Sequence, residues 1–213
     1  MANKPIPKSM HICQVDCCDS PRYALGYCIR HYGQHYRHGF ILKRTRFDPN
    51  EFIIEGDICR IKLYDRRGNE TGEAIVDGED YEKINGKKWH RCTNGYVAYI
   101  DGRKWISLHS VILETSEDEV IDHINRDGLD CRKANLRVCA HHQNCWNQGL
   151  RKNNVSGAKG VCWYKQTKRW VVRIRHKNKR VHLGYFKNKA DAVEAYNKAA
   201  LKYHGEFVAL NKL

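Results

Sequence analysis

The sequence predicts a multidomain protein of the α+β class, with three small structural parts in series. Cysteine and histidine residues gather near the N-terminus, a compact unit of two short strands and a helix is indicated between residues 120 and 148, and three strands followed by a long helix lie near the C-terminus. The 213 residues leave room for two to three small domains. We expect a metal-stabilised module at 10–40, a basic linker at 41–51, a mixed domain at 52–150, and a three-stranded antiparallel sheet with a helix at 155–213.

The composition is that of an ordinary globular protein and excludes several classes. Hydrophobic residues make up 41% of the chain, with 16 glycines and 4 prolines, which argues against a fibrous or disordered protein. No apolar stretch is long enough to cross a bilayer and the first residues lack an apolar signal core, so we expect no membrane partner and a cytoplasmic location. In that reducing compartment, cysteines near histidines hold zinc more often than they form disulfides.

Charge is distributed unevenly along the chain, whose formal net charge is +14. Residues 1–50 contain eight basic residues (Lys and Arg) and three acidic ones (Asp and Glu). Residues 51–150 contain fourteen basic and eighteen acidic residues, and residues 151–213 contain sixteen basic and three acidic residues. Basic ends of this density favour nucleic acid, although a basic surface that only aids solubility is the alternative. Acidic groups near a phosphate backbone repel it unless they hold a cation, so metal chemistry is expected in the middle segment.

The N-terminal module carries a C-x4-C-x9-C-x2-H array, formed by Cys13, Cys18, Cys28 and His31. Each pair can sit on a tight turn and present two ligands to one tetrahedral ion, so the array predicts a structural zinc site. A segment this small cannot bury enough apolar surface to fold alone, which gives the metal a structural role. Cys17 and His35 are close enough to compete as ligands, and the basic run at 43–46 is available for phosphates.

The middle segment begins with strand-like stretches. Residues 58–64 alternate in polarity and are followed by a turn at 67–69, and two further stretches at 95–100 and 104–108 flank Asp-Gly, a strong hairpin signal. Val120 and Ile121 then form a short apolar strand that delivers an Asp-His pair to its end. A second strand is expected at 136–138, and a helix at 141–148.

The polar groups of this unit suit phosphodiester hydrolysis. That reaction needs a base to activate water and a cation to neutralise charge on the phosphate and the leaving oxygen. A hard ion such as Mg²⁺, or Mn²⁺ in its place, takes few protein oxygen ligands and keeps its waters. Asp122 and Asn144 can supply a carboxylate and an amide oxygen, and His123 can act as the base.

The segment resembles the HNH homing endonucleases of phages, in which a D-H pair, an N in an N-L-R strand and a final N on the helix form the site of a ββα-metal nuclease domain. The resemblance implies that Asp122 and Asn144 bind the catalytic metal, that His123 activates water, and that Asn135 braces the loop through backbone hydrogen bonds. His109 resembles an upstream structural histidine. Cys131 departs from the family, which usually carries Asn there. The zinc array resembles small zinc fingers that precede this nuclease domain in phage proteins.

The C-terminal segment predicts three strands, near 159–164, 169–175 and 179–186, and a helix at 189–203. Trp170, Val172 and Ile174 would share one face of the sheet, and Arg173 and Arg175 the other, since successive strand residues alternate. The small alanines of the helix let it pack on the apolar face. The opposite face could then enter a major groove of DNA.

This segment resembles the Apetala-two/ethylene-response-factor domain, through K-G-V-x-W, R-W-x-x-x-I and L-G-x-F motifs and an alanine-rich helix that is close to the family pattern without matching it fully. The resemblance implies a DNA-binding domain that reads the duplex with its sheet. The residues expected to contact DNA are Arg173, Arg175, Arg169, Trp163, Arg180 and Lys187. The alternative is a basic domain that binds phosphate without reading bases.

Taken together, the residues and resemblances predict a metal-dependent, site-specific endonuclease of the homing or mobile-element type, intron-borne or free-standing. It would act as a monomer that nicks one strand of double-stranded DNA, in the bacterial cytoplasm if it is phage-encoded, and would take no small-molecule substrate. The alternative is a DNA-binding regulator with an inactive nuclease fold.

Overall fold

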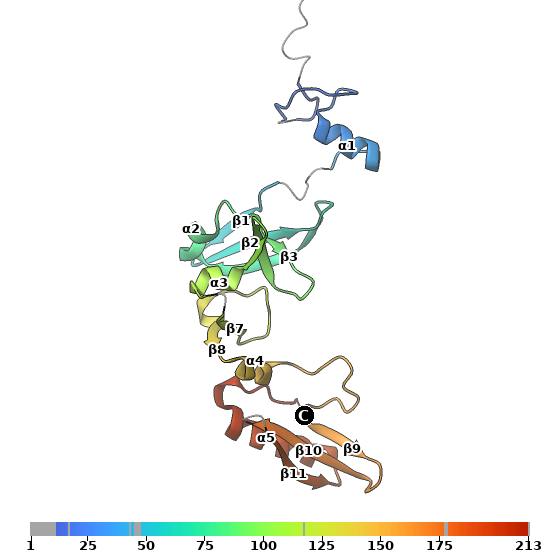
Figure 1. Ribbon diagram of the computed structural model, residues 1–213, viewed down its shortest axis with the longest axis vertical. Coiled ribbons are helices and arrows are strands. Elements are labelled where there is room, and N and C mark those ends of the chain that lie inside the picture. The colour runs from blue at the N-terminus through green and yellow to red at the C-terminus, as the bar shows by residue number, and fades with distance from the viewer. Residues whose placement is uncertain are drawn as a thin grey trace, which may run out of the picture. The chain divides into compact units, whose positions relative to one another are not determined.

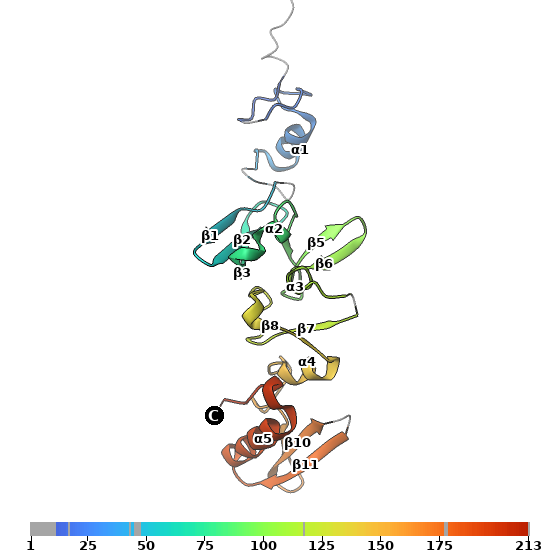
Figure 2. The same ribbon diagram turned by 90° about the vertical axis from the view of Figure 1, so that its left-hand side faces the viewer.

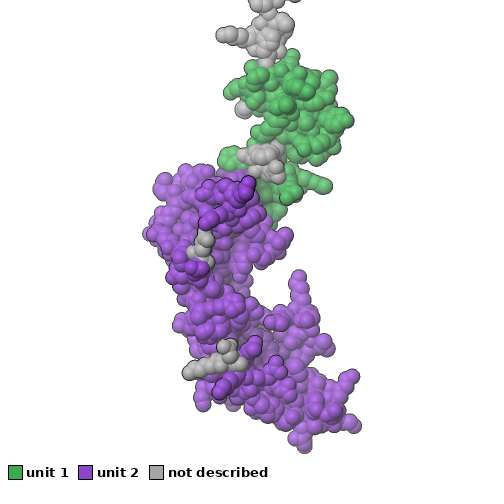
Figure 3. Space-filling view, viewed as in Figure 1, with its two compact units in different colours: residues 1–49, 64–72 green, residues 50–63, 73–213 purple. Residues whose placement is uncertain are grey.

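A computed structural model describes residues 12–16, 18–42, 44, 48–116, 118–176 and 179–212. It divides into two compact units, one formed by residues 1–49 and 64–72, and the other by residues 50–63 and 73–213 (Figure 3). Cys17, and Lys43, Thr45 and Arg46 of the basic run, lie outside the described residues. Within the described part of the chain, no helix is both long enough and apolar enough to cross a membrane.

The first unit contains one helix that the sequence analysis did not predict, α1 (Ile29–His38). The helix starts directly after Cys28, whose backbone is extended, and ends at Gly39 with a φ of 77°. That left-handed conformation favours glycine and stops the helix. The helix start therefore places Cys28 and His31 one turn apart. The predicted turn at 67–69 is present and is held by Asp65, whose Oδ1 accepts the backbone N–H of Arg67 at 2.7 Å.

The second unit begins with two three-stranded sheets. The first has the order β1 (Phe52–Glu55), β2 (Ile58–Tyr64), β3 (Glu70–Asp77), and the second the order β4 (His90–Arg91), β5 (Val97–Asp101), β6 (Lys104–Ser107) (Figures 1 and 2). The predicted hairpin is confirmed, with Asp101 paired to Lys104. Two short helices were not predicted. Helix α2 (Tyr81–Ile84) comes after the last strand of the first sheet, and α3 (Leu108–Leu113) comes after the last strand of the second.

Alternate residues of β2 are buried because one face of its sheet covers the core. Cys59, Ile61 and Leu63 are fully inaccessible, and the intervening residues are partly exposed. This is the period-2 pattern of a strand with one buried face. Trp89 is the largest buried side chain of the same core, and its indole N–H donates to the carbonyl of Ile84 at 3.0 Å.

Two strands and a helix follow, as the sequence predicts. Strand β7 (Val120–His123) pairs antiparallel with β8 (Leu136–Cys139), and α4 (His141–Asn147) comes directly after β8. A single 3-10 turn, η3 (Lys133–Asn135), precedes β8. Ile121 and Leu136 point into the core of the second unit, so the polar ends of the strands are anchored to a packed scaffold.

The C-terminal part contains the predicted sheet and helix. The strand order is β11 (Lys179–Phe186), β10 (Arg169–His176), β9 (Val161–Tyr164), and α5 (Lys189–His204) packs on this sheet before η4 (Gly205–Phe207) (Figure 1). A second core lies between them. Its buried members are Ala158, Val161, Val172, Ile174, Ala192, Val193, Tyr196 and Ala200.

Candidate functional site

The four predicted zinc ligands lie together in the first unit. The Sγ atoms of Cys13, Cys18 and Cys28 and a ring nitrogen of His31 all lie within 4.8 Å of one another. His31 Nδ1 is 3.2 Å from Cys13 Sγ and 3.5 Å from Cys28 Sγ. Tetrahedral zinc bonds of about 2.3 Å to sulfur and 2.0 Å to nitrogen imply S···N separations of roughly 3.5 Å. The cluster could therefore hold a zinc ion.

The electrostatics of this cluster also suit a metal. Burial lowers the pKa of His31, which keeps the imidazole neutral and able to coordinate. Hydrogen bonds from Ser20 lower the pKa of Cys18 and favour the thiolate. Of the two alternative ligands, Cys17 and His35, only His35 belongs to the described residues. It lies outside the cluster, and the centre of its ring is 5.2 Å from that of Tyr27.

The predicted catalytic residues line one cleft of the second unit. The cleft has a volume of about 350 Å³ and brings together Asp122 and His123 from the end of β7 with Asn144 from α4. Its other walls are Arg91, Asn94, Gly95, Tyr96, Arg126, Asp127, Gly128, Asn147, Gln148 and Gly149. Two carboxylates, one imidazole, four side-chain amides and two guanidinium groups therefore line a space that admits a small part of a larger substrate.

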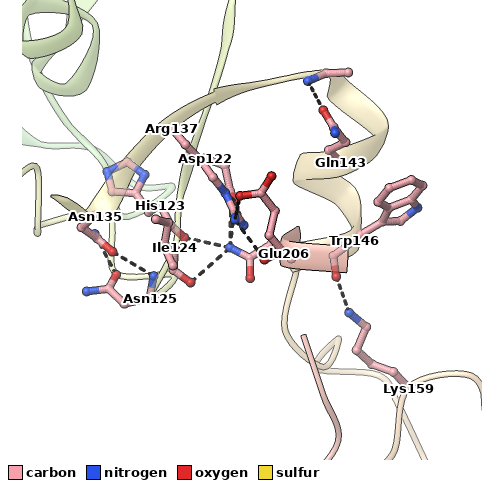
Figure 4. Close-up of polar contacts among 12 residues, drawn as sticks. Asp122, His123, Ile124, Asn125, Asn135, Arg137, Gln143, Trp146, Lys159 and Glu206 are labelled. Atoms are coloured by element: carbon pink, nitrogen blue, oxygen red, sulfur yellow. Dashed lines mark hydrogen bonds and ion pairs between the residues drawn. The ribbon is translucent and has the colours of Figure 1, made fainter. Parts of the chain in front are cut away.

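Asp122 is buried and held by two neighbours (Figure 4). Only 4% of the residue is exposed. Arg137 lies opposite it in the β7–β8 register, and the guanidinium Nε and Nη2 donate to Asp122 Oδ2 at 2.9 and 2.7 Å. Asn147 Nδ2 donates to Oδ1 at 2.9 Å and lies 3.1 Å from Oδ2. The carboxylate thus has a defined orientation.

His123 is also buried, at 4% exposure. Burial lowers its pKa, and the negative charges of Asp122, Asp127 and Asp130 oppose that shift only partly, so the ring is neutral at pH 7. Its Nε2 lies 3.7 Å from the Sγ of Cys131, whereas its buried Nδ1 has no hydrogen-bond partner among the described residues. A neutral imidazole with one free nitrogen can accept a proton.

His109 packs against this ring from α3. The two imidazoles meet edge to face with centroids 5.2 Å apart, and Tyr96 contacts both. Burial, with the adjacent His123, lowers the pKa of His109 to about 4. A neutral His109 thus packs against His123 and Tyr96, both of which line the cleft.

The loop between β7 and β8 is held by hydrogen bonds to Asn135. Its side-chain Oδ1 accepts the backbone N–H of Asn125 at 2.9 Å, and its Nδ2 donates to the carbonyl of Asp130 at 2.7 Å. Cys131 is fully buried, and burial raises the pKa of its thiol to about 12. Its Sγ lies 3.8 Å from the carbonyl of Gly128 and 3.7 Å from His123 Nε2, so the protonated thiol packs against the His123 ring in the interior.

Sequence reasoning missed two residues that hold the site, Asn147 and Arg137. Asn147 follows Asn144 by three positions on α4, a spacing that places both on one side of a helix, and this was a signal that could have been used. Its Nδ2 also donates to the carbonyls of His123 and Ile124, at 2.8 and 3.3 Å. The role of Arg137 depends on the β7–β8 register, which the sequence leaves open.

Four arginines that were expected to contact DNA share one face of the C-terminal sheet. Arg169, Arg173 and Arg175 alternate along β10, and Arg180 of β11 is paired with Arg175. Cross-strand partners point to the same face, so the four side chains project together, away from α5. Each of them is exposed.

Two further residues of the DNA-binding prediction lie elsewhere. Trp163 is paired with Trp170, whose ring packs against the core under α5, and the two indoles meet at 5.2 Å. It therefore belongs to the face that α5 covers, although 46% of it is exposed at the edge. Lys187 is exposed between β11 and α5.

Lys159, which precedes β9, contacts the C-terminal end of α4 (Figure 4). Its Nζ donates to the carbonyls of Trp146 and Gln148 at 2.8 and 2.6 Å, where the helix leaves carbonyl groups unpaired. Burial lowers the pKa of this lysine to about 8. The sequence offered no local signal for this contact, because it joins segments on either side of the 149–158 connection.

Comparisons with known proteins place the chain among nuclease-related proteins. No protein-family model matches the chain, and no solved structure matches it. A protein of Acanthamoeba polyphaga mimivirus, named as an uncharacterized HNH endonuclease, is 28% identical over 180 residues, which cover 80% of this chain and 90% of that protein. Protein 3.8 of Escherichia phage T7 is 30% identical over 87 residues, which cover 41% of this chain and 71% of that protein. The chain therefore belongs to the family of phage T7 protein 3.8 and is a distant homologue of a protein named as an HNH endonuclease.

Proposed function

We propose that this protein is a metal-dependent DNA endonuclease of the HNH type, with its catalytic centre in the cleft between β7 and α4. One observation carries the proposal: Asp122, His123 and Asn144, whose side chains suit phosphodiester hydrolysis, line the same cleft. The antiparallel pair β7–β8 followed by α4 has the element order of a ββα-metal site, and the mimiviral relative is named for this activity.

The donor atoms suit a hard divalent cation such as Mg²⁺ or Mn²⁺. Asp122 Oδ1 accepts only the hydrogen bond of Asn147 among the described residues, so it keeps a lone pair for a cation. The side-chain amide of Asn144 is partly exposed in the cleft and takes part in no hydrogen bond within the described chain. Such an ion, when bound, supplies charge neutralisation on the phosphate and leaving oxygen.

The remaining groups have roles that follow from their position and charge. We assign to His123, whose ring is neutral and which lines the cleft, the role of the base that takes the proton of the attacking water. Arg91 and Arg126 line the same cleft and supply positive charge toward a phosphodiester. Asn135 keeps the loop after His123 in place through its backbone contacts.

Double-stranded DNA is the substrate that these features favour. The arginine face of the C-terminal sheet, formed by Arg169, Arg173, Arg175 and Arg180, gives the basic segment 151–213 a surface that could enter a major groove. We infer a site-specific enzyme of the mobile-element type that acts as a monomer in the cytoplasm of a bacterial host. The described residues form one such cleft, and we infer that the enzyme nicks one strand. The Cys/His cluster of the first unit would hold a structural zinc ion.

Plasmid cleavage tests the proposal directly. Purified protein is incubated with supercoiled plasmid, with and without Mg²⁺ or Mn²⁺, and the conversion to open-circular DNA is measured. Nicking that requires the metal and disappears in His123→Ala supports the proposal. Binding without cleavage under any divalent metal refutes it and supports the alternative, a DNA-binding regulator with an inactive nuclease fold.

A further inference from the structure

Arg137 is placed between the proposed metal ligand and the C-terminal part of the chain. On one side, its Nε and Nη2 both donate to the same oxygen of Asp122, Oδ2. Arg137 is 15% exposed at the side chain and Asp122 4%, so the pair is shielded from water. Loss of one partner of a pair this buried leaves an uncompensated charge and is strongly destabilising.

On the other side, Arg137 contacts the segment that follows α5. Its Nη1 donates to the backbone carbonyl of Glu206 at 3.0 Å, and its guanidinium lies 3.9 Å from the ring centre of Phe207 (Figure 4 shows Glu206 beside Arg137). Phe207 is 8% exposed, so the stacked cation has little competition from solvent. Each of the three guanidinium nitrogens thus donates a hydrogen bond either to Asp122 or to η4.

These contacts give the two carboxylate oxygens of Asp122 different hydrogen-bond partners. Oδ2 accepts both hydrogen bonds from Arg137 and lies 3.1 Å from Asn147 Nδ2, whereas Oδ1 accepts only from Asn147 within the described part of the chain. A cation entering the cleft would meet Oδ1 as the available ligand atom. Without Arg137, the carboxylate could rotate or chelate through both oxygens.

We propose that Arg137 is a positioning residue that makes Asp122 a one-oxygen metal ligand, and that Glu206 and Phe207 of the C-terminal part hold it in place. This inference rests on the proposed nuclease function. It makes the C-terminal part a structural component of the catalytic centre in addition to a DNA-binding surface.

The proposal has two consequences of opposite sign. A guanidinium 2.7 Å from the carboxylate repels an incoming cation, so its removal should strengthen metal binding. The same removal frees the carboxylate, so the cation would settle in a different position relative to His123. Displacement of reacting groups by about 1 Å can cost on the order of a hundredfold in rate.

The experiment compares wild type with Arg137→Gln, using the zinc-loaded full-length chain. Mn²⁺ binding without DNA is measured from the loss of the free-ion electron paramagnetic resonance signal, and cleavage is measured at saturating Mn²⁺. We expect Mn²⁺ to bind as tightly as in wild type or more tightly, while the maximal nicking rate falls at least tenfold. A merely structural role would weaken both together, and either that result or an unchanged rate would overturn the proposal.

Conservative variants test the link to η4. Phe207→Leu keeps the apolar packing but removes the ring under Arg137. Like Arg137→Gln, it should lower the maximal nicking rate, in this case several-fold. Phe186→Leu, in the core under α5 and away from Arg137, is the matched control and should leave the rate unchanged. The double variant Phe207→Leu with Arg137→Gln should be no slower than Arg137→Gln alone. Additive losses would show that Phe207 does not act through Arg137.

The failure of this inference can be distinguished from failure of the proposed function. If wild type binds Mn²⁺ but nicks no DNA, the nuclease proposal fails. The Arg137 proposal fails with it, because there is then no nicking reaction whose rate the position of Asp122 could affect. If wild type nicks and Arg137→Gln nicks equally fast, only the positioning proposal fails.

Discussion

Two asparagines on α4, three residues apart, should respond to the same substitution in opposite ways. Asn147 is 4% exposed and its Nδ2 contacts the Asp122 carboxylate and the carbonyls of His123 and Ile124. Asn144 is partly exposed in the cleft. We predict that Asn147→Ala costs stability first, and that Asn144→Ala costs activity with little effect on stability.

The contacts set the magnitudes. The two amide protons of Asn147 serve a charged acceptor, worth roughly 1.5–3 kcal/mol, and a neutral carbonyl, worth about 1 kcal/mol. Asn147→Ala should therefore lower the free energy of unfolding by about 2–4 kcal/mol. Asn144→Ala removes no described hydrogen bond and places a better helix former on α4, so its effect should stay within about 0.5 kcal/mol.

Urea unfolding monitored by tryptophan fluorescence measures the stability of both variants, and plasmid nicking against Mg²⁺ concentration measures activity. Asn144→Ala should require much more Mg²⁺ or fail to nick, with wild-type unfolding. If the two variants lost the same stability, the assignment of Asn147 as the structural residue and Asn144 as the metal ligand would be refuted. Unchanged nicking by Asn144→Ala would remove it from the metal site.

Three further predictions concern other parts of the chain. His123→Ala should lose nicking by about a hundred- to ten-thousand-fold while binding DNA normally, and the wild-type rate should fall only below the ordinary histidine pKa, because burial lowers the pKa of His123. Purified protein should contain about one zinc per chain by metal analysis, and Cys28→Ser should lose it. Arg173→Ala should cost roughly 1–3 kcal/mol at a cognate duplex and less at a scrambled one, whereas Lys187→Ala should weaken both alike. Equal losses for Arg173→Ala on the two duplexes would reduce the arginine face to an electrostatic anchor.

Stability should also depend on pH through His109, since its folded pKa is about 4 and the ordinary value is 6.5. Below pH 6.5 the unfolded chain takes up a proton that the folded chain refuses, so stability is full above pH 6.5 and falls as the pH drops toward 4. At about 1.4 kcal/mol per pKa unit, the loss approaches roughly 3 kcal/mol. His109→Gln should flatten this dependence in urea unfolding measured at several pH values, and an unchanged slope would show that His109 does not cause it.

The elements that sequence predicted well are those set by local patterns. The hairpin around Asp101 has a two-residue turn signal, β10 is rich in aromatic and β-branched residues with Arg173 and Arg175 at alternate positions, and α5 has a stripe of small and aromatic residues. All three elements are present. The four candidate zinc ligands could also be predicted from the sequence, because the spacing of cysteine and histidine residues encodes a structural metal site in a small module. In each case the information lies within one short, continuous segment of the sequence.

The contacts that the sequence did not predict join residues far apart in the chain. Arg137 touches Asp122 through strand register and Phe207 through tertiary packing, and neither follows from a local pattern. Helix α1 was also missed, because its apolar positions are few and its start depends on Cys28 and the cap at Gly39. Register and tertiary packing are decided by the whole core, so a one-dimensional pattern constrains them weakly.

The C-terminal part contacts the β7–β8–α4 unit at several places, which include the stacking of Trp146 on His204, and two of the contacts support the proposed catalytic centre. This changes how the function of the C-terminal part can be tested. Lys159 caps the end of α4, and the Glu206–Phe207 segment contacts Arg137 beside Asp122. Deletion of residues 155–213 would therefore remove both supports of the proposed catalytic centre together with the arginine face. A loss of nicking in that truncation would not separate DNA binding from catalysis. Single substitutions on the arginine face leave both supports intact, so they isolate the contribution of DNA binding.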